Sequence, residues 1–241
     1  VNVCSLTIIR SKLSMQKKLD IQPNVLFLFL KYIFMKGTKG TETKALIRET
    51  AFKLFLTKEY NMVPLKDIEQ SLNLSRGCMS YHYPTKQDLL VDVINFYILD
   101  TQKVKHQFDN VTDMSLLEYL NWYVDNIAKT MERLTQFVIP DTNINGTRAY
   151  MNLILQAEKY YPGFHQLLNE IEKNEMIQLK QIATKAQKEG EIRSTCNIDL
   201  FVQQIRLIFL GKSYQDALRN GLDVNTLREQ FIFLYFLIKN K

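Results

Sequence analysis

The side chains best suited to molecular recognition gather between positions 75 and 86 of this 241-residue chain. They are Arg76, Cys78, Ser80, Tyr81, His82 and Lys86, and Lys66 lies shortly before them. Guanidinium, ammonium, hydroxyl and imidazole groups are those with which proteins contact phosphates and base edges, and an arginine can bind a guanine through two hydrogen bonds. These residue types in one short segment indicate a nucleic-acid interface.

Two short helices joined by a tight turn are expected to position these side chains. Apolar residues repeat at helical spacing over 65–72, a four-residue break follows at 73–76, and a second helix is expected over 77–83. Thr85 is a candidate cap for a longer third helix. A helix-turn-helix unit of this size places its second helix in the major groove of DNA.

The same segment resembles the recognition-helix region of the tetracycline-repressor (TetR) family of transcription regulators. The matching residues are Ser75, Gly77, His82, Lys86 and Leu89, with Met79, Tyr83 and Thr85 as conservative replacements. Ser80 replaces the usual tyrosine, which removes one phosphate contact, and Pro64 stands where a capping threonine is common. Asn73 replaces the usual turn glycine, but asparagine also tolerates a left-handed conformation, so the turn is expected to persist.

The resemblance implies an all-α fold of about nine helices in two domains. The helix-turn-helix domain is expected over residues 41–101, with the motif at about 64–83, and an effector-binding and dimerisation domain over 102–241. Outside the motif, the hydrophobic periods predict helices over 41–58, 85–106, 115–134, 147–160, 164–188, 198–219 and 225–240. The implied function is that of a ligand-responsive repressor that binds a palindromic DNA operator as a homodimer.

The individual DNA contacts follow from residue type and from the resemblance. Phosphate contacts are expected from Lys86, the Thr43 hydroxyl, Lys44 and the helix N-terminus at Gly77. Base-edge contacts are expected from Arg76, Cys78 and Tyr81, with Lys66 and His82 as further candidates.

Net charge leaves a second hypothesis open. The chain carries a formal charge of +6, and residues 1–40 hold seven basic side chains against one acid, so residues 41–241 are balanced. A basic DNA-facing surface must therefore be local. This balance and the serine at position 80 are compatible with an alternative, a TetR-like helical ligand-binding or adaptor protein without specific operator binding.

Residues 1–34 are expected to be a disordered arm or an upstream extension of the reading frame. They show no sustained helical period, and Met35 begins a segment that resembles the basic arm and first helix of TetR-family proteins. The apolar run at 25–35 is too short to span a bilayer, which needs about twenty residues. Three scattered cysteines favour a reducing, cytoplasmic setting.

No catalytic or metal-binding constellation is evident in the sequence. His82, His106 and His165 do not have metal-ligand spacing, and Cys-x-x-Cys, phosphate-loop and Gly-x-Ser-x-Gly motifs are absent. We therefore expect a protein that is not an enzyme and that holds neither a metal ion nor a cofactor.

A small-molecule effector site is expected among the C-terminal helices. Its candidate residues are Tyr119, Trp122, Tyr123, Arg148, Tyr150, Phe164 and His165. Aromatic side chains with a few polar groups are typical of a ligand pocket between helices. The alternative is that these residues form ordinary core.

The last two helices are expected to form a dimer interface. Residues 231–238 are eight apolar residues in a row, so this helix needs cover on more than one side. The resemblance implies that the second cover is a partner subunit, through a four-helix bundle with candidate residues Ile205, Phe209, Phe231, Leu234 and Ile238. The alternative is a buried C-terminal helix in a monomer.

Overall fold

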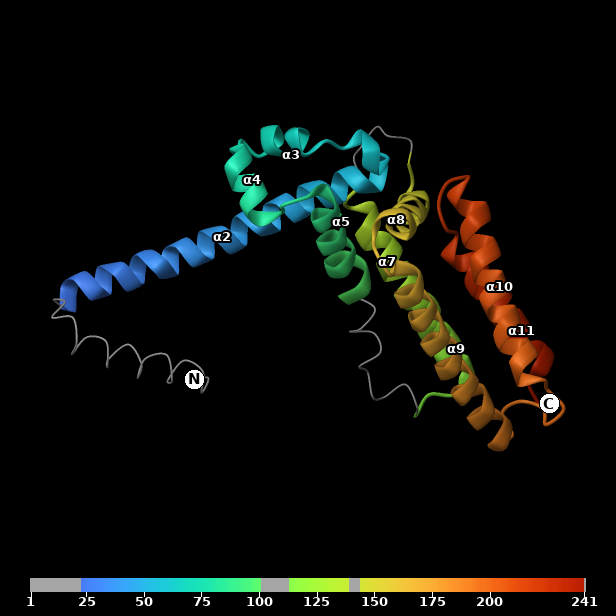
Figure 1. Ribbon diagram of the computed structural model, residues 1–241. Coiled ribbons are helices and arrows are strands. Elements are labelled where there is room, and N and C mark those ends of the chain that lie inside the picture. The colour runs from blue at the N-terminus through green and yellow to red at the C-terminus, as the bar shows by residue number, and fades with distance from the viewer. Residues whose placement is uncertain (1–22, 101–112, 139–143, 241) are drawn as a thin grey trace. The chain divides into compact units, whose positions relative to one another are not determined.

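The computed structural model describes residues 23–100, 113–138 and 144–240, with side-chain surroundings from residue 40 onward. These residues form helices and connecting turns without a strand, which confirms the all-α expectation (Figure 1). None of the described helices is long and apolar enough to cross a membrane. The chain divides into two compact units, residues 1–46 and 47–241.

The first helix is longer than the sequence predicts. α2 (Pro23–Thr57) begins well before residue 41, so the predicted start of this helix is wrong. No proline follows Pro23 within the helix, and its glycines, Gly37 and Gly40, each cost only about 1 kcal/mol in a helix. Residues 1–22 of the expected N-terminal extension lie outside the described residues.

The helix-turn-helix motif forms as predicted. η1 (Tyr60–Met62) leads into α3 (Leu65–Ser71), and α4 (Arg76–His82) follows after the turn. Ser75 caps α4 by accepting a 3.2 Å hydrogen bond from the Cys78 amide. Thr85 confirms its predicted role by capping the next helix in a reciprocal capping box with Asp88.

A shared apolar core holds the motif against the helices on either side. Its fully buried members include Ile47, Phe52 and Phe55 of α2, Ile68 of α3, Met79 of α4, and Leu89 and Leu90 of α5 (Lys86–Ile94). α5 continues into a π-helical stretch, η2 (Asn95–Leu99). The expected continuation to His106 lies outside the described residues. π-helical turns inside α-helices are frequent at functional sites.

The buried Tyr83 hydroxyl anchors α4 to α5. It donates a 2.6 Å hydrogen bond to the Asp92 carboxylate, which also accepts a 3.3 Å bond from Arg48. Burial, together with the Asp92 hydrogen bond and charge, raises the pKa of Tyr83 far above its ordinary value. The hydroxyl therefore remains a hydrogen-bond donor throughout the physiological pH range.

Replacing Tyr83 by phenylalanine is expected to lower the free energy of unfolding by about 1.5–3 kcal/mol, the net contribution of a hydrogen bond to a charged group. Urea denaturation measures the change. Tyr81→Phe is the matched control, because the Tyr81 side chain is 82% exposed and the loss of its hydroxyl should cost less than about 0.5 kcal/mol. Equal losses in the two variants would contradict a stabilising Tyr83–Asp92 bond.

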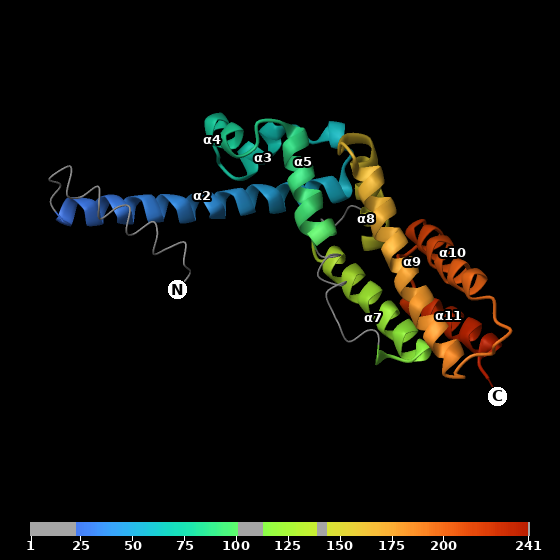
Figure 2. The ribbon, with the colours of Figure 1, turned by 60° about the horizontal axis from the view of Figure 1, so that its bottom comes forward.

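Five helices build the C-terminal part. They are α7 (Leu116–Thr135), α8 (Gly146–Tyr160), α9 (Phe164–Lys188), α10 (Ile198–Ala217) and α11 (Val224–Ile238). Figures 1 and 2 show α7, α9, α10 and α11 running alongside one another, and α8 lies against α5. Gly190 and Gly221 follow the C-terminal ends of α9 and α10 and have positive φ angles of 80° and 94°, a conformation that glycine adopts without strain.

Candidate nucleic-acid interface and effector cavity

One face of α4 is exposed. Its residues are Arg76, Gly77, Ser80 and Tyr81. They share a face because residues three to four positions apart lie above one another on a helix. Met79 points the other way and is fully buried, and Cys78 and His82 are half-buried at the border. The structure therefore brings six of the predicted DNA-contact residues together on one short helix.

Gly77 leaves open space on this face. A Cβ atom at position 77 would meet no other atom within 4 Å, so the fold has room for a side chain there. A glycine inside a helix destabilises it by about 0.5–1 kcal/mol relative to alanine. No packing contact within the protein requires a glycine at this position. The missing side chain does allow a second molecule to approach the α4 backbone closely.

The turn before α4 adopts the left-handed conformation that the sequence predicts. Asn73 has a φ of 52°, and it is the one non-glycine residue with positive φ among the residues that the structure describes. Its amide donates to the Gln70 carbonyl at 3.2 Å, and the Leu74 amide donates to the Glu69 carbonyl at 2.8 Å. The turn thus fixes where α4 begins relative to α3.

Asn73→Gly is expected to keep stability within about 0.5 kcal/mol, whereas Asn73→Val should cost about 1–2 kcal/mol, because a β-branched side chain clashes in this conformation. Thermal unfolding of both variants measures the difference. The glycine variant serves as the control for loss of the amide group. If valine and glycine behave alike, the turn does not depend on a left-handed residue.

The predicted DNA-contact residues outside α4 differ in exposure and in their contacts within the protein. Lys66 of α3 is exposed. The Lys86 ammonium instead donates to the Tyr60 carbonyl at 2.8 Å and lies 4.2 Å from the Tyr60 ring centroid, and burial lowers its pKa. Lys86 therefore ties α5 to η1 within the protein. Thr43 and Lys44 lie in the first compact unit, in α2.

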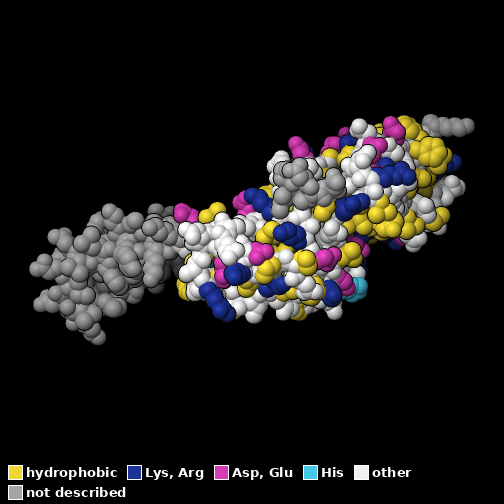
Figure 3. Space-filling view, turned by 90° about the horizontal axis from the view of Figure 1, so that it is seen from above, with side chains coloured by type: hydrophobic (Ala, Val, Ile, Leu, Met, Phe, Trp, Pro, Cys, Tyr) yellow, Lys and Arg dark blue, Asp and Glu magenta, His cyan; other side chains and the backbone are white. Residues whose placement is uncertain are grey.

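The surface around the motif mixes both signs of charge. Figure 3 looks onto the side that carries α3 and α4 and shows Lys and Arg side chains interspersed with Asp and Glu. This distribution agrees with the charge balance of residues 41–241. Within residues 47–241, any attraction to DNA must therefore come from the few basic side chains on the α3–α4 face.

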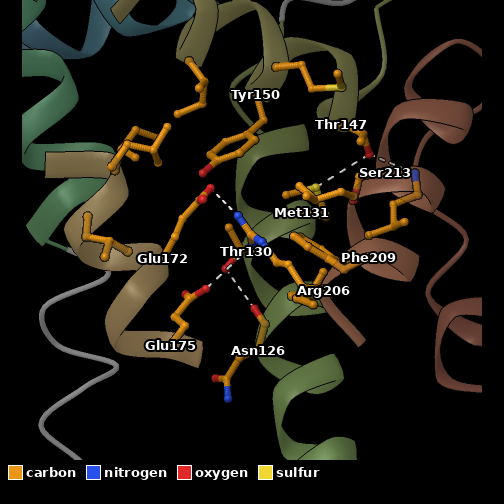
Figure 4. Close-up of a pocket in the computed structure, with 18 of the residues that line it drawn as sticks. Asn126, Thr130, Met131, Thr147, Tyr150, Glu172, Glu175, Arg206, Phe209 and Ser213 are labelled. Carbon is orange, nitrogen blue, oxygen red and sulfur yellow. Dashed lines mark hydrogen bonds and ion pairs between the residues drawn. The ribbon is translucent and has the colours of Figure 1, made fainter. Parts of the chain in front are cut away.

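A cavity of about 300 Å³ lies among α7, α8, α9 and α10. Ile98 and Leu99 of η2 complete its wall. The predicted effector residues that line it are Tyr119, Trp122, Tyr123, Tyr150 and Phe164, of which Figure 4 labels Tyr150. Arg148 and His165 do not line it. Arg148 donates to the Ala217 carbonyl at 3.0 Å, and the exposed His165 lies 3.0 Å from Glu158.

Three charged side chains of the cavity are absent from the sequence-based expectation. They are Glu172 and Glu175 of α9 and Arg206 of α10. Figure 4 shows the Arg206 guanidinium directed at both carboxylates; it forms an ion pair with Glu172 and lies 4.0 Å from Glu175. One feature of the sequence could have identified this cluster. Arg206 interrupts the apolar stretch at 205–210, and a charged side chain in such a stretch needs a buried partner.

The phenols of the cavity act as neutral hydrogen-bonding groups. Burial, and then the negative charge of Glu175, raise the pKa of Tyr119 and Tyr123 and raise the pKa of Tyr150 to about 12. All three hydroxyls therefore stay protonated and can orient a polar ligand group.

The end of α8 contacts the helix-turn-helix region directly. The Tyr160 ring stacks on the Tyr60 ring at 4.0 Å, and the Tyr160 carbonyl accepts a 2.9 Å bond from Gln87 of α5. One turn earlier, the Gln156 amide donates to the Phe55 carbonyl at 3.0 Å. Because α8 also lines the cavity, this helix and η2 both join the cavity to the motif.

The predicted dimer residues are divided among different surroundings. Ile205 and Phe231 are buried inside the protomer, Phe209 lines the cavity, and Leu234 and Ile238 are half-buried. The large apolar residues that α10, its C-cap Leu218 and α11 leave exposed are instead Leu200, Leu207, Leu210, Tyr214, Leu218, Phe233, Phe236 and Leu237. Figure 3 shows hydrophobic side chains gathered on the right of the view, where these two helices lie.

The architecture defines a class of protein in which a helix-turn-helix head is joined to a helical domain that encloses a cavity. Solved structures of TetR-family transcriptional regulators share this fold at low sequence identity. One from Cytophaga hutchinsonii is 14% identical, with a TM-score of 0.59 over 84% of this chain and 98% of that one. Another from Agrobacterium tumefaciens is 15% identical, with a TM-score of 0.58 over 83% and 100%. The chain therefore has the TetR-family fold, which confirms the resemblance at this level.

Sequence comparison adds a local match. The chain is 38% identical over 56 residues to an uncharacterized HTH-type transcriptional regulator, YuxN, of Bacillus subtilis (strain 168). That match spans 23% of this chain and only 19% of the relative. No protein-family model matches the chain.

Proposed function

We propose that this protein is a DNA-binding transcriptional regulator that acts as a homodimer on a palindromic operator and is released from DNA by a small molecule. The observation that carries the proposal is the exposed face of α4, with Arg76, Ser80 and Tyr81 beside an unobstructed Gly77. The TetR-family fold supports it. Arg76 and Tyr81 read base edges, with the exposed Lys66 of α3 as a further base-edge contact.

The exposed face of α10 and α11 is the proposed dimer interface. Leu207, Tyr214 and Leu218 repeat along one side of α10, with exposed fractions of about 60% each, beside Phe233 and Phe236 of α11. Gly211 lies on the same side, and a Cβ there would meet nothing within 4 Å, so a second helix can approach closely. An apolar surface of this kind marks an interaction site.

Release from DNA depends on the two elements, η2 and α8, that connect the cavity to the helix-turn-helix motif. A ligand that displaces Ile98 or Leu99 acts on η2 and α5, and one that displaces Tyr150 acts on α8 and its Tyr160 contacts. Either change alters the spacing of the two α4 helices, which must fit successive major grooves about 34–36 Å apart. Coupling of this kind is reciprocal, so DNA weakens ligand binding by the factor by which ligand weakens DNA binding.

Selection of binding sites from random duplex DNA tests the proposal. We expect enrichment of a symmetric motif with two half-sites about one helical turn apart. The alternative function is that of a helical ligand-binding or adaptor protein. The loss of a phosphate contact at Ser80 and the mixed surface charge support it. It predicts only sequence-blind binding that disappears as salt rises.

A further inference from the structure

The charged groups of the cavity are already paired within the protein. Among the described residues that line it, the charged side chains are Glu172, Glu175 and Arg206. Arg206 forms an ion pair with Glu172 and lies 4.0 Å from Glu175, which has interaction partners of its own in the protein. Glu172 is also 39% exposed, so water screens its charge. The cavity therefore offers neither a free guanidinium to an anion nor a free carboxylate to a cation.

A ligand charge of either sign would have to break these pairs. An anion would compete with two carboxylates for Arg206, whose side chain is only 15% exposed and also donates a hydrogen bond to the Tyr123 hydroxyl. A cation would compete with Arg206 for the same carboxylates. Because a charge that leaves water without gaining a partner is costly, the geometry favours an uncharged ligand.

The hydroxyl of Tyr150, on α8, is a polar group of the cavity that the protein does not use. It makes no hydrogen bond within the described part of the chain, and burial raises its pKa to about 12, so it stays protonated. The neighbouring phenols differ, because Tyr119 donates to the Gln178 side chain at 3.4 Å and Tyr123 accepts from Arg206. The Tyr150 hydroxyl is therefore available to donate to a ligand.

We propose that the cavity binds an uncharged, largely apolar molecule with a hydrogen-bond acceptor, such as an aryl-alkyl ketone or amide, whose oxygen accepts from the Tyr150 hydroxyl. Apolar and aromatic side chains of η2 and of α7 to α10 surround the rest of the molecule. This inference rests on the proposed role of the cavity as an effector site and names the class of effector. The cavity volume of about 300 Å³ suits a small ligand, at the lower end of the range for ligand pockets.

Three probes of one shape test the charge preference. They are 7-phenylheptan-2-one, 6-phenylhexanoate and 6-phenylhexanamidinium, which are neutral, negative and positive at pH 7. Trp122 is the single tryptophan of the chain and lines the cavity, so its fluorescence reports occupancy without DNA. We expect the ketone to bind about 10- to 100-fold tighter than either charged probe, because neither charge finds a free partner.

Tyr150→Phe tests the hydrogen bond to the ligand. It should weaken ketone binding about 3- to 10-fold, because the lost hydroxyl donates to the ketone oxygen. Tyr119→Phe is the matched control, since it removes the same atom from the same cavity but from a hydroxyl that already donates to Gln178. The control should change ketone affinity less than about twofold. The infrared carbonyl band of the bound ketone should shift to lower frequency in the unmodified protein and lose this shift in Tyr150→Phe.

Arg206→Gln tests whether charge pairing causes the preference. The variant leaves two carboxylates without their guanidinium, so the amidinium probe should bind at least as tightly as the ketone. Arg228→Gln is the matched control, because Arg228 pairs with Asp125 on α7 and does not line the cavity. It should keep the order of the three probes. Circular dichroism verifies that each variant is folded.

Tighter binding of either charged probe to the unmodified protein would overturn the inference. So would equal losses in Tyr150→Phe and Tyr119→Phe, an unchanged order in folded Arg206→Gln, or failure of the ketone to bind. Operator binding is measured on the same preparations. A protein that selects a symmetric DNA site but prefers a charged probe retains the proposed function and loses only the effector class. A protein that binds the ketone but selects no symmetric site loses the proposed function instead.

Discussion

Leu207→Glu is expected to convert the protein from a dimer to a monomer and to weaken operator binding at least about 100-fold. Leu207 is 59% exposed in the protomer, so a glutamate there leaves the protomer core intact. In a dimer it would bury a charge in an apolar helix contact, which is strongly unfavourable. Linking two DNA-reading heads raises overall affinity by about 10²–10⁴ over one head, and this gain would disappear.

Sedimentation equilibrium measures the oligomeric state, and fluorescence anisotropy with the selected duplex measures DNA affinity. Ile177→Glu is the matched control, because Ile177 is also exposed, at 43%, but belongs to α9 and not to the proposed α10–α11 interface. The control should remain dimeric. If Leu207→Glu also remains dimeric, the interface lies on another surface.

Arg76→Ala is expected to weaken operator binding by about 1–3 kcal/mol, which corresponds to about 5- to 150-fold. The loss should be largest for the native operator and should shrink for duplexes altered at one base pair in each half-site, because a bidentate arginine reads a guanine. Arg76→Lys keeps the charge without the paired donors and should restore little of this discrimination.

Arg193→Ala is the control for loss of one positive charge, since Arg193 is exposed and follows α9, outside the motif. An equal loss of affinity of Arg76→Ala for every duplex would mean that Arg76 contacts phosphate alone. In that case Tyr81 and Cys78 would be the side chains that contact base edges.

The motif is the part of the molecule that sequence predicts best. Its signals are local, because the caps at Ser75 and Thr85 and the left-handed Asn73 depend on residues a few positions away. The start of α2 is less predictable, because Gly37, Gly40 and Thr41 have the residue types of a helix boundary, yet the helix continues through them.

The cavity and the dimer face depend on how distant helices rotate against one another. Five aromatic residues of the cavity were predictable from composition, whereas the contact of Arg206 with Glu172 joins α9 and α10 across the fold. A helix that is apolar all round does not reveal which side faces its own protomer. Phe231 therefore lies in the core and Phe233, two residues on, is exposed.

The affinity ratio between the selected operator and a scrambled duplex of equal length tests sequence-specific DNA binding most directly. At about 0.15 M salt we predict a ratio of at least about 10³ in favour of the operator. The contrary result is equal affinity for both duplexes, with binding to each falling steeply as salt increases. That outcome would leave the α4 face without a role in reading sequence.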